Sequence, residues 1–231
     1  MSELMGLIVE RKIKPIVFLI EKTRDYKKSK AMEQLLEQME KLYLQSKIYC
    51  EYQFMFLTFS EATLVHSDRF INLRDFCSRK ALKQSQVDVS GLLDVLDANM
   101  TLDKFRGWSA YYLPHVILLS DGSSEYVNYE NLNSIIENNA LLKKARRCVV
   151  SFGRPSENTN EFFSQFAGTS NELMVVDEGK LSPKSTVKGI AKSIFDVTKD
   201  DTEEIERYSN CSDFFEKHFA DIVCEDPPEE D

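Results

Sequence analysis

The amino-acid sequence predicts an α/β fold, with a doubly wound, mostly parallel sheet of six strands, one antiparallel edge strand and helices on both faces. Two short apolar runs, "IVFLI" at 16–20 and "HVILL" at 115–119, are typical of strands that are buried on both faces. Segments with helical spacing follow most of the strand-like runs, and parallel strands need such crossover connections. The alternation of strand and helix therefore favours parallel pairing, and we expect the two apolar strands to be adjacent and parallel.

The N-terminal half contains two expected strands with a helix between them. The strand at 16–20 is followed by a segment at 29–46 whose apolar residues recur at helical spacing, and Ser29 is the expected N-cap. The aromatic-rich run at 49–60 is typical of a second strand. Residues 62–73 can continue it as a hairpin, which would supply the antiparallel edge strand.

The C-terminal half continues the alternation of helices and strands. Gly168 stands at an expected helix C-terminus, where glycine is favoured, and Pro183 lies near the first turn of the last helix. The expected elements are a loop at 88–91 that enters a helix ending at 102, further helices at 129–145, 159–168 and 182–198, and strands at 115–120, 147–153 and 172–177.

The net charge of -9 is unevenly distributed along the chain. From Asp200 onward there are thirteen acids and two bases, whereas residues 1–199 hold 25 acids and 27 bases. We therefore divide the chain into a domain at 1–199 and an acidic C-terminal segment at 200–231. An acidic chain gives no electrostatic reason to expect nucleic-acid binding.

The cysteines and the apolar runs bear on where the protein works. The five cysteines are scattered and odd in number, which argues against a disulfide framework and favours a reducing compartment. The N-terminal apolar run is too short for a signal peptide, and no run reaches transmembrane length. We expect a cytoplasmic protein that does not bind membranes.

Polar side chains follow two of the expected strands and precede the middle helix. In a doubly wound sheet such loops meet at the carboxyl ends of the strands, next to the point where the strand order reverses. Carboxylate and hydroxyl oxygens without thiols or imidazoles suit Mg²⁺, Mn²⁺ or Ca²⁺. The alternative is that these residues are only helix caps and turn residues. The candidate metal ligands are Glu21, Thr23, Asp25, Ser90 and Asp121.

These residues and their order resemble the von Willebrand factor A domain, in its bacterial tellurium-resistance-type branch. The family has an apolar strand followed by Asp-x-Ser-x-Ser, a Thr before a middle helix, and a Thr-Asp-Gly after the fourth strand. Here "VFLIEKTRDY" stands at the first motif, Ser90 of "DVSGLLDVL" at the Thr, and Asp121 of "LPHVILLSDG" at the last acid. The resemblance covers about residues 13–197 and implies a metal-ion-dependent adhesion site.

The first motif departs from the family in ways that bear on the metal. Glu21 is one methylene longer than the family's Asp, and Asp25 puts a full negative charge where the family has a serine hydroxyl. Lys22 and Arg24 lie in the same loop, where either could pair with an acid in place of an ion. We expect a degenerate site that binds a divalent cation such as Mg²⁺ weakly or not at all.

The sequence predicts a non-catalytic interaction or scaffold module. The resemblance implies a protein partner, such as a kinase, a phosphatase or a stress-response protein. The alternative is a metal-assisted hydrolase or phosphate-binding enzyme of flavodoxin-like topology. A helix at 212–222 would either dock on the protein itself or bind a partner. The residues expected to contact the partner at the loop end of the sheet are Arg24, Tyr26, Ser123 and Tyr126.

Overall fold

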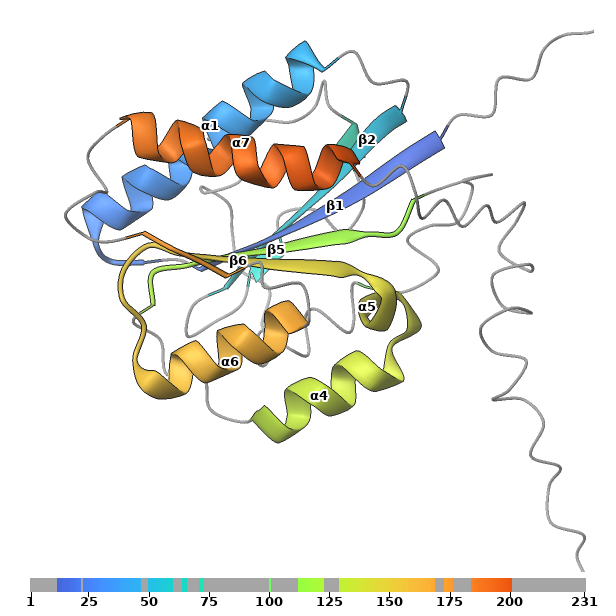
Figure 1. The fold of residues 1–231 in the computed structure, drawn as a ribbon, viewed down its shortest axis with the longest axis vertical. Helices are drawn as coiled ribbons and strands as arrows, with labels where there is room; N and C mark the ends of the chain where they lie inside the picture. Colours follow the sequence, from blue (N-terminus) through green and yellow to red (C-terminus); the bar gives the residue numbers. More distant parts are fainter. Residues whose placement is uncertain are drawn as a thin grey trace, which may run out of the picture.

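The computed structural model describes residues 12–21, 23–46, 50–59, 64–65, 71–72, 100, 112–122, 129–168, 173–176 and 184–200. Figure 1 shows a central sheet with a layer of helices on each side. The elements in chain order are β1 (Lys12–Glu21), α1 (Tyr26–Gln45), β2 (Cys50–Phe59), β3 (Leu64–Val65), β4 (Ile71–Asn72), β5 (His115–Ser120), α4 (Tyr129–Asn138), α5 (Ala140–Lys144), β6 (Arg146–Ser151), α6 (Glu157–Ala167), β7 (Leu173–Val175) and α7 (Lys184–Asp200).

Five of the strands run parallel, in the order β2-β1-β5-β6-β7. The predicted α/β architecture with a parallel sheet is therefore confirmed. The predicted count of six strands with a full antiparallel edge strand is not shown, because β3 and β4 are antiparallel segments of two residues each, both paired with β2.

Strands β1 and β5 are adjacent and parallel, as the two apolar runs predicted. Their register places Val17 beside Val116 and Leu19 beside Leu118. From β1 the chain goes on to β2 on one side of the sheet, and β5, β6 and β7 follow on the other side. The strand order therefore reverses between β1 and β5, which is where ligands bind in sheets of this kind.

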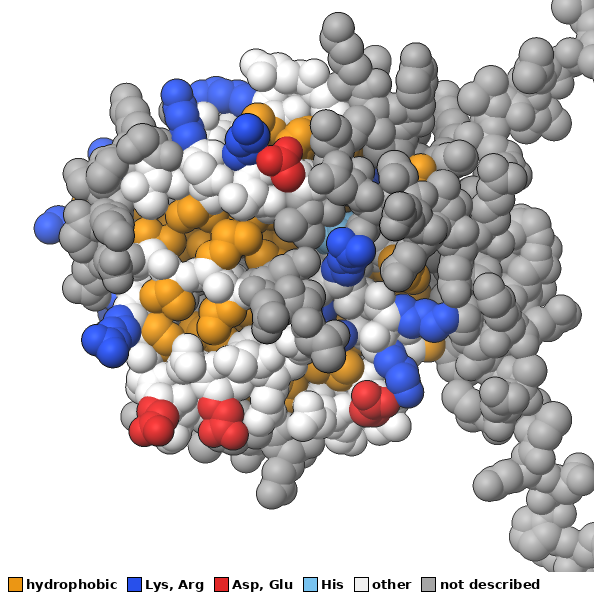
Figure 2. All heavy atoms as spheres, in the orientation of Figure 1, with side chains coloured by type: hydrophobic (Ala, Val, Ile, Leu, Met, Phe, Trp, Pro, Cys, Tyr) orange, Lys and Arg blue, Asp and Glu red, His pale blue; other side chains and the backbone are white. Residues whose placement is uncertain are grey.

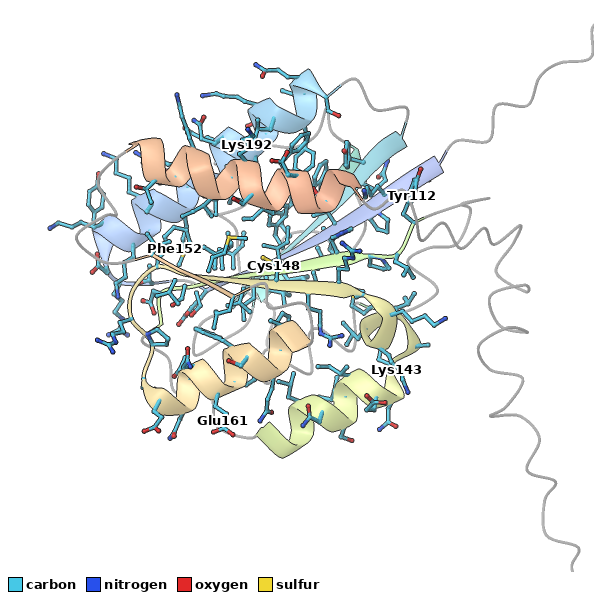
Figure 3. All side chains as sticks on the ribbon, in the orientation of Figure 1. Tyr112, Lys143, Cys148, Phe152, Glu161 and Lys192 are labelled. Atoms are coloured by element: carbon cyan, nitrogen blue, oxygen red, sulfur yellow. The ribbon has the colours of Figure 1, made fainter. Side chains whose placement is uncertain are left out.

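The sheet separates two apolar cores. Val17 and Leu19 pack with α4, α5 and α6, whereas Ile16, Phe18 and Ile20 pack with α1 and α7. Both sets alternate along β1, because successive side chains of a strand point to opposite faces. The two helical layers are apparent in Figure 1, and Figure 3 shows Cys148 and Phe152 on the side of α1 and α7.

The first helix begins earlier than the sequence predicted. Its N-cap is Asp25, whose side chain accepts hydrogen bonds from the amides of Lys27 and Lys28 at 2.8 and 3.2 Å. The expected cap, Ser29, lies inside the helix, and its amide bonds to the carbonyl of Asp25 at 2.9 Å. A carboxylate that satisfies two free amides at a helix start stabilises that start over a later one.

Two further helix ends show one correction and one confirmation. The single helix expected at 129–145 is broken at Asn139, whose side chain caps α5 by accepting from the amides of Leu141 and Leu142. Gly168 ends α6 with φ 67°, a backbone conformation that favours glycine.

Some predicted elements lie outside the described residues. They are the loop and helix expected at 88–102, apart from Met100, and the C-terminal segment beyond Asp200, where α7 ends. None of the helices in the described part of the chain is long and apolar enough to span a membrane.

Candidate functional site

The site begins with Glu21, the last residue of β1. Its side chain is only 3% exposed although it carries a carboxylate. The Oε2 atom accepts a hydrogen bond from the hydroxyl of Ser120 and another, at 3.0 Å, from the amide of Asp121. A buried carboxylate needs such donors because it has lost its hydration. Glu21 therefore joins the carboxyl ends of β1 and β5.

The chain turns sharply after Ser120 to form the second part of the site. The amide of Gly122 donates to the Ser120 hydroxyl at 3.1 Å, and Gly122 has φ 75°. The carbonyl of Ser120 also accepts from the amide of Phe152 at 2.7 Å, which ties this turn to the end of β6. Asp121, in the middle of the turn, is 4% exposed.

Lys28 approaches this turn from the first turn of α1. Its Nζ donates to the carbonyl oxygen of Asp121 at 3.0 Å. It also lies against Gly153, since a Cβ atom at that glycine would come within 2.8 Å of Nζ. Gly153 has φ 144°, and its carbonyl accepts from the Ser151 hydroxyl at 2.8 Å. Loops that follow β5 and β6 therefore meet the first helix at Lys28.

The predicted ligands after β1 form a local turn. The hydroxyl of Thr23 accepts from the amide of Asp25 at 3.0 Å, and the Asp25 carboxylate caps α1 as described. Asp25 is exposed, whereas Glu21 is buried. The structure brings Glu21 and Asp121 together, and it places Thr23 and Asp25 in a capping turn at the start of the helix. Ser90, Ser123, Tyr126 and Lys22 lie outside the described residues.

In the arrangement that the structure describes, with Lys28 in place, the described side chains do not form a site for a divalent metal ion. Among them, no group of three His, Cys, Asp or Glu residues lies close enough together to hold an ion. The Oε2 atom of Glu21 accepts from two donors within the site, and the Oδ1 atom of Asp25 accepts from two helix amides. A metal ligand needs an oxygen lone pair aimed at a shared centre. Whether an ion binds weakly stays a prediction, as does the assignment of the ligands.

Lys28 is the site residue that the sequence interpretation missed, since it named Lys22 and Arg24 as the competing bases. Arg24 is exposed and Lys22 lies outside the described residues. The sequence does hold a signal. A helix start carries partial positive charge, so the consecutive lysines Lys27 and Lys28 in the first turn of α1 are unfavourable there unless a partner holds one of them.

The surface next to the site is basic and carries an exposed aromatic ring. The segment 23–30 contains four bases and one acid. Tyr26 is 74% exposed, and the ammonium of Lys30 lies 5.8 Å from the centre of its ring. Arg24 and Lys27 are exposed beside it. We call the residues Arg24, Tyr26, Lys27 and Lys30 the α1 surface.

A second exposed region lies along β7, the edge strand of the parallel sheet in the described part of the chain. Val175 is 45% exposed. Figure 2 shows hydrophobic side chains gathered between α7 and α6, where β7 runs in Figure 1. Unlike the α1 surface, this region is apolar.

Comparisons with known proteins agree with the fold. No protein-family model and no curated protein sequence matches the chain. The chain is similar to the solved structure of proximal thread matrix protein 1 from the mussel byssus, with a TM-score of 0.57 and 13% identity over 81% of this chain and 49% of that one. The chain thus spans about half the length of the mussel protein. Such a likeness shows the α/β fold alone.

Two bacterial structures are more distant. One is the PilB minor pilin of Streptococcus sanguinis, with a TM-score of 0.47 and 12% identity over 80% of this chain and 61% of the pilin. The other is the BatB protein of Bacteroides thetaiotaomicron, with a TM-score of 0.42 and 11% identity over 81% of this chain and 100% of the BatB chain.

Proposed function

We propose that this protein is a non-catalytic interaction module of the von Willebrand factor A type, which binds a protein partner at the carboxyl end of its sheet. The parallel sheet, the reversal of strand order between β1 and β5, and the placing of Glu21 beside Asp121 support this proposal. Function on a fold of this kind is decided by the site and its surroundings. The degenerate adhesion site positions the loops, and the neighbouring surface makes the contacts.

The observation that carries the proposal is the exposure of Tyr26 at 74%, next to Arg24 and at the start of α1. Tyrosine and arginine are enriched among the residues that dominate binding energy at interfaces. Tyr26 buries little surface in the protein itself, so it is free to provide a large contact area to a partner. The bases around it favour a partner segment that carries acidic residues.

The hydrogen bonds of Glu21 favour a structural role over a catalytic one. A general base needs an oxygen that can reach a substrate proton. The Glu21 carboxylate instead accepts from Ser120 and Asp121 within a buried turn. The module would therefore act as a scaffold in the cytoplasm, beside a kinase, a phosphatase or a stress-response protein.

The test starts with affinity capture of the tagged protein from its host, followed by measurement of binding to the captured partner. The double variant Arg24→Glu with Tyr26→Ala should weaken binding by roughly tenfold or more, because it removes an aromatic contact and reverses a charge. Its melting temperature should stay near that of the wild type, since both side chains are exposed.

A matched control lies at the other end of the same helix. Lys41→Glu with Leu44→Ala also reverses an exposed base and removes an exposed apolar side chain, because Leu44 is 58% exposed. This control should bind as the wild type does, and so should a protein that ends at Asp200. The proposal is wrong if Val175→Glu on β7, or removal of residues 201–231, abolishes binding while the α1 surface variant does not.

A further inference from the structure

The resemblance to von Willebrand factor A domains implies a divalent cation at the loop end of the sheet, and the described side chains do not fit one. The two predicted ligand acids that the fold brings together are both buried, with Glu21 at 3% and Asp121 at 4% exposure. Buried acidic side chains are stabilised by hydrogen-bond donors and also by positive charge nearby. The question is which group supplies it.

Lys28 reaches this place from the first turn of α1. Its Nζ lies 3.0 Å from the carbonyl oxygen of Asp121, and this contact joins residues 93 positions apart in the sequence. Asp121 in turn donates its amide to Glu21. The ammonium group of Lys28 and the buried carboxylate of Glu21 therefore bind the backbone of the same residue, Asp121.

The loop after β6 leaves room for the ammonium group. A Cβ atom at Gly153 would lie 2.8 Å from Nζ and 3.2 Å from Cε of Lys28, and 3.0 Å from the carbonyl oxygen of Asp121. Any residue larger than glycine would crowd this contact. A glycine here therefore permits the close approach of a backbone to the lysine side chain.

The position of Lys28 in the first turn of α1 also indicates that its ammonium group needs a partner. The start of a helix carries partial positive charge, which disfavours a lysine in the first turn. Lys27, the neighbouring residue in that turn, is exposed to solvent, whereas Lys28 is partly buried against Asp121 and Gly153. A lysine that is partly buried at the unfavourable end of a helix needs compensating contacts, and the Asp121 carbonyl is one of them.

From these contacts we infer that the ammonium group of Lys28 takes the place of the divalent cation at this site. The positive charge is covalently attached and does not depend on metal supply. Lys28 thus supplies the positive charge at the same site on which the proposed function rests. Its consequence is that partner binding at the α1 surface is insensitive to metal chelators.

The first experiment compares three proteins by thermal unfolding, with and without millimolar Mn²⁺. The wild type and Lys27→Met, the matched neighbour, should melt at the same temperature and should not respond to Mn²⁺. Lys28→Met should melt about 4–8 °C lower, since it loses a hydrogen bond from a charged donor. Mn²⁺ should restore part of this loss, because an ion can then occupy the place of the ammonium group beside the Asp121 carbonyl and near the two buried acids.

Two outcomes would overturn the inference. One is that Mn²⁺ stabilises the wild type as much as it stabilises Lys28→Met, which would mean that the lysine does not displace the ion. The other is that Mn²⁺ leaves Lys28→Met unchanged, which would mean that no cation site lies beneath the lysine.

A second measurement needs no variant and covers the case in which Lys28→Met fails to fold. The amide signals of Asp121, Gly122 and Gly153 are followed by NMR in the wild-type protein while Mn²⁺, a paramagnetic ion, is added. Unchanged signals support the inference, and selective broadening of these three signals contradicts it. Neither experiment uses a partner, so a failed partner capture would count against the proposed function alone.

Discussion

The amide of Asp121 donates a 3.0 Å hydrogen bond to the Glu21 carboxylate, although 100 residues separate the two in the sequence. The same oxygen of Glu21 accepts from the hydroxyl of Ser120. These contacts connect the ends of β1 and β5, the two strands between which the strand order reverses. A carboxylate at this place therefore has a structural role, whatever else the site binds.

Replacing Glu21 tests that structural role. Glu21→Ala leaves the Asp121 amide and the Ser120 hydroxyl without this acceptor in a buried place, so it should lower the free energy of unfolding by about 2–4 kcal/mol. Glu21→Gln keeps an oxygen acceptor of the same reach and should lose less. Urea unfolding of both variants measures the difference. Equal stability of Glu21→Ala and wild type would contradict the role.

Gly153 provides a test of the contact between the β6 loop and Lys28. Gly153→Ala should destabilise by about 1–3 kcal/mol, because an L-residue is strained at φ 144° and the new methyl group meets Nζ and the Asp121 carbonyl. The control is Gly189→Ala in α7, where a Cβ meets nothing within 4 Å. That change should stabilise by about 0.5–1 kcal/mol through helix propensity. Opposite signs in denaturant unfolding are the expected result.

Asp25 distinguishes a helix cap from a metal ligand. Asp25→Ala should lower the melting temperature by about 2–4 °C because two helix amides lose their acceptor. Asp25→Asn and Asp25→Ser should restore most of that loss, since both are good caps. A ligand would behave differently: all three variants would change Mn²⁺ binding measured by calorimetry. Such a result would show that the cap also serves an ion.

Glu40 makes stability depend on pH. Burial first, and the nearby Glu37 second, raise the pKa of Glu40 above its ordinary value of 4.5, while Lys41 lowers it. A raised pKa means that the folded protein holds the proton more tightly than the unfolded chain does. Ionised Glu40 therefore lowers the free energy of unfolding at neutral pH. This loss of stability disappears as the pH falls through the pKa of Glu40 in the folded protein.

The corresponding variant is Glu40→Gln, which removes the charge at every pH. It should be slightly more stable than the wild type at neutral pH, and the advantage should disappear in acid. Thermal unfolding of both proteins across the acidic range measures this. An advantage that grows as the pH falls would contradict the direction of the pKa shift.

Several features of this protein could be read from local patterns in the sequence. The runs at 16–20 and 115–119 predicted central strands of a parallel sheet, because residues buried on both faces must lie inside a sheet between two helical layers. Gly168 predicted a helix end, because glycine tolerates positive φ. These predictions depend on residues close together in the chain, so the sequence alone contains what decides them.

Other features were decided by the tertiary structure. Both Asp25 and Ser29 are good caps, and helical spacing alone does not choose between them. The break at Asn139 depends in part on a contact of its side-chain amide with the carbonyl of Met100, 39 residues away. The sequence pattern at 129–145 carries no information about that partner.

The site shows the same division between sequence and structure. Acids at the ends of two apolar strands placed Glu21 and Asp121 together, because parallel strands end at one edge of the sheet. Which base lies beside them could not be read in this way. Arg24 is nearer to Glu21 in the sequence, but it points to solvent, and Lys28 reaches Asp121 instead. The direction of a lysine side chain on α1 depends on how the helix packs on the sheet, and that packing exists only in the folded protein.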